Sequence, residues 1–104
     1  MKVGTDMTTI FKVYAKKAFP ELDKFTRTIE KVHGENHPEL REVRQLFLTI
    51  QDKTQKDDFT RVMLTSDIAR LQSITANYTP PADACQAYQK TYAMLKALDE
   101  TYQK

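Results

Sequence analysis

Apolar residues recur at steps of three and four positions along most of this chain, and this periodicity constrains the fold more than any other feature of the sequence. Such spacing places the apolar side chains on one face of an α-helix. Only two glycines and four prolines are available for turns, which favours a few long helices over many short strands. Because 104 residues can build one hydrophobic core but not two, we expect a single domain.

The pattern divides into four amphipathic stretches, and we predict helices over residues 7–32, 38–55, 59–77 and 80–103. Pro20 interrupts the first stretch, where it removes one backbone hydrogen bond, so we expect a kink there or a break into two helices. Four such helices joined by short turns bury their apolar faces most simply against one another. The sequence therefore predicts an all-α fold, an up-down-up-down antiparallel four-helix bundle.

The first corner holds a glycine, a histidine and a proline in an order typical of a helix end followed by a helix start. Gly34 can take the left-handed conformation that ends a helix. His37 is then placed as the N-cap of the second helix and Pro38 as its first residue, where the missing N–H costs nothing. At the other end of the first helix, Thr5 or Asp6 can act as the cap.

The two later corners are marked by different residues. Asp57, Asp58 or Thr60 can cap the third helix, although no glycine or proline marks that boundary. Before the last helix, Thr79 is placed as the cap and Pro80 as the first helical residue.

Each predicted helix has one apolar stripe that we expect to face the core. The stripe residues are Ile10, Val13, Tyr14, Leu22, Phe25, Ile29 and Val32 in the first helix, Leu40, Val43, Phe47 and Ile50 in the second, Leu64, Ile68, Leu71 and Ile74 in the third, and Cys85, Tyr88, Tyr92, Leu95, Leu98 and Tyr102 in the fourth.

Charge and composition favour an intracellular protein over a nucleic-acid or membrane protein. The net charge is +2 and the two signs are mixed along the chain, unlike the clustered basic footprint of a nucleic-acid binder. We interpret Lys12, Lys16 and Lys17 as a small solvated patch, with a surface for a partner as the alternative. Apolar runs are only a few residues long, so we expect neither a signal peptide nor a membrane span. A single cysteine, Cys85, forms no internal disulfide and is consistent with a cytoplasmic location.

Four segments together resemble a known family. They are Phe19-Pro-Glu-Leu22, Lys31-Val-His-Gly34, His37-Pro-Glu-Leu40 and the run from Tyr78 to Tyr88 that contains Thr-Pro-Pro-Ala-Asp-Ala-Cys. In order and spacing they are similar to the hemerythrin-like domain of the iron–sulfur cluster repair proteins, over nearly the whole chain. The resemblance implies a four-helix bundle that holds a di-iron centre with imidazoles and carboxylates from its helices.

The ligand set that the resemblance implies is mostly absent from this chain. Of the expected metal ligands, His33 and a shortened acid, Asp57, stand at matching positions. Lys12, Lys53 and Arg61 occupy places where the family has histidines, and its last histidine and glutamate would follow the final residue. Protonated cations repel a metal ion and cannot ligate it. We therefore expect no normal di-iron centre, and cations that pair with an acid or extend into solvent.

The functional expectation is a non-catalytic module that binds a partner protein or a second copy of itself, with no cofactor. The alternative is an iron-binding stress or nitric-oxide response protein whose di-iron site is completed by another chain or by a longer form. A third possibility is a redox or nitric-oxide sensor that uses Cys85. No phosphate loop or Ser/His/Asp grouping indicates a hydrolase.

The histidines, the cysteine and two tyrosines each have both a structural and a functional interpretation. His33 suits a helix C-terminus on electrostatic grounds, and the corner between His33 and His37 breaks the spacing that a shared metal would need. We expect Cys85 to be a small buried side chain, with a reactive thiol at a helix N-terminus as the alternative. Tyr88 and Tyr92 are predicted to be core residues and not part of a cofactor site.

Overall fold

The computed structural model describes the backbone of residues 7–104 and the side chains of residues 10–104. Within this range the chain is all-helical, with no strand, so the predicted all-α class is confirmed. The elements are α1 (Met7–His33), α2 (Glu39–Thr54), a 3₁₀ turn η1 (Arg61–Leu64), α3 (Thr65–Ile74) and α4 (Gln86–Gln103). The expected caps of α1, Thr5 and Asp6, lie outside the described residues.

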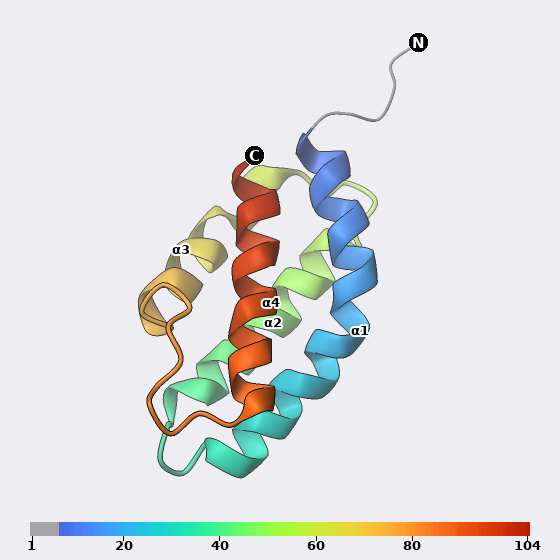
Figure 1. Ribbon diagram of the computed structural model, residues 1–104. Helices are drawn as coiled ribbons and strands as arrows, with labels where there is room; N and C mark the ends of the chain where they lie inside the picture. The colour runs from blue at the N-terminus through green and yellow to red at the C-terminus, as the bar shows by residue number, and fades with distance from the viewer. Residues whose placement is uncertain (1–6) are drawn as a thin grey trace.

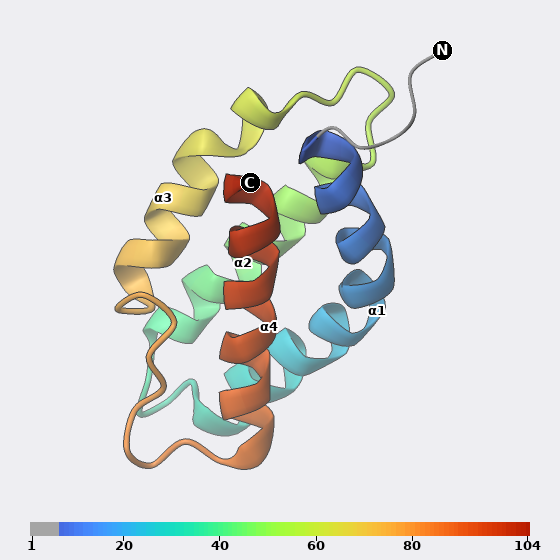
Figure 2. The same cartoon turned by 45° about the horizontal axis from the view of Figure 1, so that its top comes forward.

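The four helices pack around one another, which is compatible with a four-helix bundle. α1 packs against both α2 and α4, and α3 packs against α2. Figures 1 and 2 show α4 between α1 and α3, with α2 behind it. The connection from α1 to α2 lies at one end of the molecule, and the connection from α2 to η1 lies at the other (Figure 1). No helix in residues 7–104 combines the length and the apolar character needed to cross a membrane.

α2 buries the face that the sequence predicts to lie against the core. Leu40, Val43, Phe47 and Ile50 are all 1% exposed or less. These four large apolar residues follow one another at steps of three and four, and Leu46 and Leu48 beside them are partly buried against the same core, so α2 buries one broad apolar face.

α1 buries a somewhat different face from the predicted one. Val13 and Val32 were expected to be buried, but each is 66% exposed. Two alanines, Ala15 and Ala18, lie in the core instead. A search for large apolar side chains overlooks alanines, although they let a neighbouring helix approach closely. The buried residues of α1 are Phe11, Ala15, Ala18, Phe19, Leu22, Thr26 and Ile29.

Pro20 does not break α1, which continues as one helix from Met7 to His33. Figures 1 and 2 show the ribbon of α1 changing direction near its middle. A kinked but continuous helix is expected where proline removes a single backbone hydrogen bond from an otherwise well-packed helix.

The corner between α1 and α2 forms without a left-handed glycine. No glycine in the described residues has a positive φ, so the expectation for Gly34 is wrong. The Gly34 N–H still bonds to the Glu30 carbonyl at 2.9 Å, and a Cβ added to Gly34 would overlap that carbonyl oxygen. Glycine is needed at position 34 because the Glu30 carbonyl oxygen occupies the space that a Cβ would fill. α2 begins at Glu39, one residue later than predicted, although Pro38 already has helical φ and ψ.

The connection between α3 and α4 is longer than predicted, because α3 ends at Ile74 and α4 begins only at Gln86. Ala76, Asn77 and Tyr78 all have positive φ, between 51° and 63°, and the Asn77 N–H bonds to the Gln72 carbonyl at 2.8 Å. This left-handed turn ends α3.

The expected helix start at Pro80 is also wrong. Pro81 follows Pro80 directly, and a residue that precedes a proline is disfavoured in the helical region. Thr60, in contrast, stands as the N-cap before the third helical segment, which opens with η1 before α3.

Polar side chains join α3 and the following turn to α4. Asp99 is only 5% exposed and accepts hydrogen bonds from the Tyr78 hydroxyl at 2.7 Å and from Gln72 Nε2 at 2.8 Å. Burial and this contact with Asp99 raise the pKa of Tyr78. The left-handed turn is therefore anchored to α4 through its last residue, Tyr78.

Replacing Gly34 with alanine should destabilise the protein, because the new methyl group collides with a backbone atom that cannot rotate away. We expect a loss of about 1–3 kcal/mol in the free energy of unfolding, measured by urea denaturation. Gly34→Ala with an unchanged midpoint would show that the corner can shift at no cost. The control is Ala93→Gly at an exposed position in α4. It measures the ordinary cost of exchanging alanine for glycine in a helix, without a collision.

Candidate functional site

Lys53, which replaces an expected histidine ligand, forms an ion pair across the bundle. Its ammonium donates to Asp67 Oδ2 at 2.8 Å and to the Met63 carbonyl at 3.0 Å. The two charged side chains are 31% and 12% exposed. Of the two alternatives left open for a cation at this position, the structure shows pairing with an acid, and the pair with Asp67 ties α2 to α3.

Arg61, at a second ligand position, connects η1 to the C-terminal end of α4. Its guanidinium donates to the Tyr102 carbonyl and lies 5.1 Å from the centre of the Tyr102 ring. The Tyr102 hydroxyl in turn donates to the Arg61 carbonyl at 3.0 Å. A cation over an aromatic face is favourable, so Arg61 stabilises the meeting of these two segments.

Lys12, at the third position, lies over an aromatic cluster at the same end of the bundle. Its ammonium is 5.5 Å from the centre of the Phe59 ring. The Phe11 ring lies 6.2 Å from that of Phe59 and 5.9 Å from that of Tyr102. The rings of Phe11, Phe59 and Tyr102 therefore form one cluster that contacts both Lys12 and Arg61.

The structure does not bring the two predicted metal ligands together. His33 is the last residue of α1, whereas Asp57 is exposed in the connection from α2 to η1. These two segments lie at opposite ends of the molecule (Figure 1). Of the cationic positions, Lys53 and Arg61 are engaged in the contacts between helices described above.

This donor set does not fit a di-iron centre, which needs several imidazoles and carboxylates around one interior space. The described part of the chain has no group of three or more His, Cys, Asp or Glu side chains that could hold a metal ion. At the three positions where the resemblance implies histidines, the chain has the ammonium groups of Lys12 and Lys53 and the guanidinium of Arg61. No step of a reaction can be derived through iron from these residues.

A second group of reactive side chains lies at the end of the bundle that holds the first corner. Cys85 is exposed and free, contrary to the expectation of a buried thiol, and stands as the N-cap of α4. Its sulfur is 3.3 Å from His33 Nε2, within hydrogen-bonding distance for sulfur. This thiol–imidazole contact joins the end of α1 to the start of α4.

Two buried tyrosines lie beneath this group. Tyr88 and Tyr92 are 0% and 2% exposed, which confirms that they are core residues. The Tyr88 ring is 5.1 Å from the His33 ring and 5.6 Å from the His37 ring. Burial raises the pKa of Tyr88, so its hydroxyl stays neutral at ordinary pH.

His37 bonds to the connection before α4, and its side chain does not cap α2. Its Nε2 is 3.0 Å from Asp83 Oδ1, and its Nδ1 is 3.6 Å from Glu39 Oε2. The hydrogen bond from His37 lowers the pKa of the Asp83 carboxyl. Together with the His33–Cys85 contact, this pair fastens residues 79–85 to the first corner.

No family model matches the chain, and no solved structure matches it significantly. The similarity to the hemerythrin-like family therefore depends on the sequence motifs, and the structure adds a compatible all-helical architecture.

We expect Lys53→Met to lower the free energy of unfolding by about 1–3 kcal/mol, because it leaves the Asp67 carboxylate partly buried without its partner. The measurement is urea denaturation, and Lys53→Met/Asp67→Leu should recover most of the loss. Lys56→Met is the matched control, because Lys56 pairs with Asp52 at 3.5 Å on the exposed surface. The control should cost less than about 0.5 kcal/mol. Equal losses in Lys53→Met and Lys56→Met would contradict a structural role for the ion pair.

Proposed function

We propose that this protein is a non-catalytic, up-down-up-down antiparallel four-helix bundle of the hemerythrin-like type, related to the iron–sulfur cluster repair proteins and without their di-iron centre. Its role is to bind another protein, or a second copy of itself, in the cytoplasm. Four sequence segments with the order and spacing of that family support the relationship, as does the all-helical structure.

The observation that carries this proposal is the contact between Lys53 and Asp67. At a position where the family resemblance implies a histidine, the chain has an ammonium group that bridges two helices at 2.8 Å. Removing the charge would cost stability, so the cation belongs to the structure of the bundle. A metal ion at that place would have to overcome both the charge repulsion and the loss of the pair.

In a bundle whose interior is filled by its own side chains, a partner binds to the outer surface and not between the helices. Ligand sites in four-helix bundles are built from side chains that project between facing helices. Here the space between the facing helices is filled by aliphatic and aromatic side chains that form one hydrophobic core, and the partly exposed Lys53 is paired with Asp67. Binding through the outer faces of the helices is the role that remains consistent with this arrangement.

Metal content measured together with solution mass tests the proposal. The full chain, purified from iron-supplemented cells without chelators, should contain substoichiometric iron both as a monomer and in any oligomer. Iron at di-iron stoichiometry would overturn the proposal. Iron that appears only in an oligomer, and that falls in His33→Gln, would instead support a site completed by another chain.

A second candidate function is a thiol-based redox or nitric-oxide sensor. The specific observation in its favour is the 3.3 Å separation between the exposed Cys85 sulfur and His33 Nε2. An imidazole at this distance is placed to accept the thiol proton as the sulfur reacts, in the way that a general base assists a nucleophile. The N-terminal end of α4 adds the positive end of a helix dipole beside the sulfur.

Alkylation by iodoacetamide tests this second candidate, with the native protein followed by mass spectrometry. We expect Cys85 to react readily, and His33→Gln to slow the reaction about threefold or more. His37→Gln is the control, because His37 contacts Asp83 and not the sulfur. A slow native reaction, or equal rates in the protein and in His33→Gln, would exclude activation of Cys85 by His33.

A further inference from the structure

The acidic side chains of α1 are used mainly on the side that faces α2. Asp23 accepts a hydrogen bond from Arg44 at 2.8 Å, and Glu30 is 3.8 Å from the guanidinium of Arg41. Arginines of α2 therefore neutralise these two acids within the contact between the two helices. The outward side of α1 is left without those negative charges.

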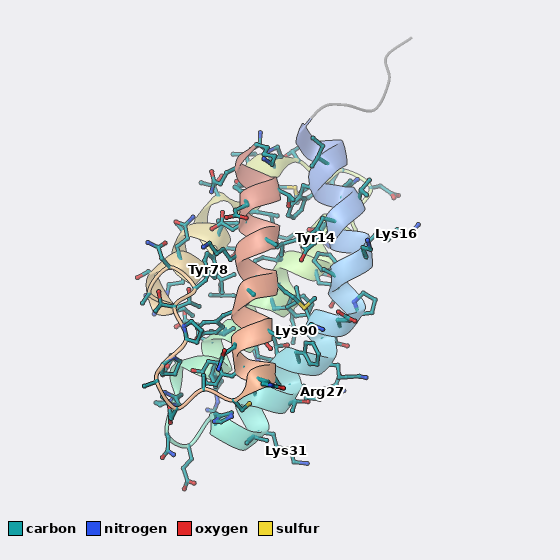
Figure 3. The ribbon with its side chains drawn as sticks, viewed as in Figure 1. Tyr14, Lys16, Arg27, Lys31, Tyr78 and Lys90 are labelled. Atoms are coloured by element: carbon teal, nitrogen blue, oxygen red, sulfur yellow. The ribbon has the colours of Figure 1, made fainter. Side chains whose placement is uncertain are left out.

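The outward side of α1 carries a line of cations. Lys17, Lys24, Arg27 and Lys31 follow one another at steps of seven, three and four residues, which keeps them on one side of a helix. All four are exposed, and Lys16 stands beside Lys17. We call these five residues the basic stripe. Figure 3 shows Lys16, Arg27 and Lys31 pointing away from the bundle.

The lysines of the basic stripe are not neutralised by their own chain. Lys16, Lys17, Lys24 and Lys31 form no ion pair with any side chain of residues 10–104. Only Arg27 has an acidic neighbour, Asp23, at 3.4 Å in an exposed contact. Such a row of like charges repels itself and attracts an acidic partner.

An apolar hollow lies next to the basic stripe, between α1 and α4. Its volume is about 360 Å³, and it is lined by Tyr14, Lys17, Ala18, Glu21, Lys90 and Met94. Lys17 and Lys90 supply cations, Glu21 supplies one acid at the edge of the hollow, and Ala18, Tyr14 and Met94 supply apolar surface. Lys90 is positioned over the Phe25 ring, 5.5 Å from its centre, and Figure 3 shows Lys90 on the α4 side of this surface.

An apolar side chain is exposed at the N-terminal end of the basic stripe. Val13 continues the line of the stripe by one further helical turn before Lys17, and it is 66% exposed. A surface that combines cations, an exposed valine and an apolar hollow matches a ligand with acidic and apolar faces. The helical line from Val13 to Lys31 is about 27 Å long at 1.5 Å per residue, which is the length of a partner helix of five turns.

We propose that the basic stripe and the adjoining hollow dock an acidic amphipathic helix of a partner protein. This inference depends on the proposed function, because it assigns the surface that the binding module uses. Carboxylates of the partner helix pair with the lysines, and an apolar side chain of the partner enters the hollow between α1 and α4. Burial of that side chain supplies affinity, and the charges supply orientation and rapid association.

A partner protein fits this surface better than a nucleic acid or a membrane. The net charge of the whole chain is only +2, so the attraction is local and does not extend over a face broad enough to follow a phosphate backbone. A lipid surface would need large apolar side chains on the stripe to insert, and its exposed apolar residue is a valine.

The test uses the full chain and a fluorescent synthetic peptide of 20 residues with glutamates on one helical face and leucines on the other. A scrambled peptide of the same composition removes the amphipathic pattern, and a DNA duplex and phosphatidylserine vesicles serve as competing anions. Fluorescence anisotropy at about 50 mM and about 300 mM salt separates charge from apolar contact.

The matched variants change charge by the same amount in two places. Lys17→Glu/Lys24→Glu/Lys31→Glu reverses the basic stripe. Lys56→Glu/Lys96→Glu/Lys104→Glu reverses three exposed lysines outside it. A neutralised variant, Lys17→Gln/Lys24→Gln/Lys31→Gln, keeps the test valid if the reversed stripe fails to fold, which circular dichroism would show.

We expect the amphipathic peptide to bind more tightly than its scrambled form, with affinity reduced about tenfold or more by reversal of the stripe and less than about twofold by the control reversal. Equal binding of the two peptides, equal effects of the two reversals, or tighter binding of DNA or vesicles would overturn the inference. Self-association lost in the reversed stripe would do the same, because the occupant would be a second copy. None of these outcomes bears on metal content, so the inference can fail while the proposed function stands.

Discussion

The structure depends on the way in which Lys53 is neutralised inside a helical bundle. An unpaired ammonium that is two-thirds buried would cost several kcal/mol, and the bundle avoids this cost with a carboxylate from α3 and a carbonyl from η1. The same end of the bundle holds Arg61 over Tyr102 and Lys12 over Phe59. Cations at three positions where the family resemblance implies histidines thus contribute structural contacts: Lys53 joins α2 to α3 and η1, Arg61 joins η1 to α4, and Lys12 joins α1 to the connection before η1.

The parts of the fold that could be predicted from sequence are those in which a single physical signal acts alone. In α2, Leu40 and Phe47 belong to a single apolar face with steps of three and four residues, and that face is buried as predicted. In α1 the apolar residues are spread over more than one face, and packing selects the face that has alanines at Ala15 and Ala18. The last helix was predicted too early because Pro80 was treated as a helix start, although the proline after it restrains Pro80 to extended backbone.

The candidate sites were less predictable, because they depend on contacts between residues far apart in sequence. That Lys53 pairs with an acid follows from the cost of burying a charge, but its partner Asp67 could be identified only once η1 and α3 were placed. The contact between His33 and Cys85 spans 52 positions and exists because residues 75–85 cross to the first corner before α4 begins. The basic stripe could not be predicted from the sequence either. Only the packing of α2 shows that Asp23 and Glu30 pair with arginines of α2 and not with the outward lysines.

The central claim is that a paired ammonium, that of Lys53, stands where the proposed relationship implies a metal ligand, so that no iron binds between the helices. Anomalous diffraction at the iron absorption edge, from crystals of the full chain grown with ferrous iron, tests this claim most directly. The account predicts Lys53 in contact with Asp67 and no anomalous peak between the helices. A pair of iron peaks inside the bundle, with Lys53 displaced from Asp67, would contradict it.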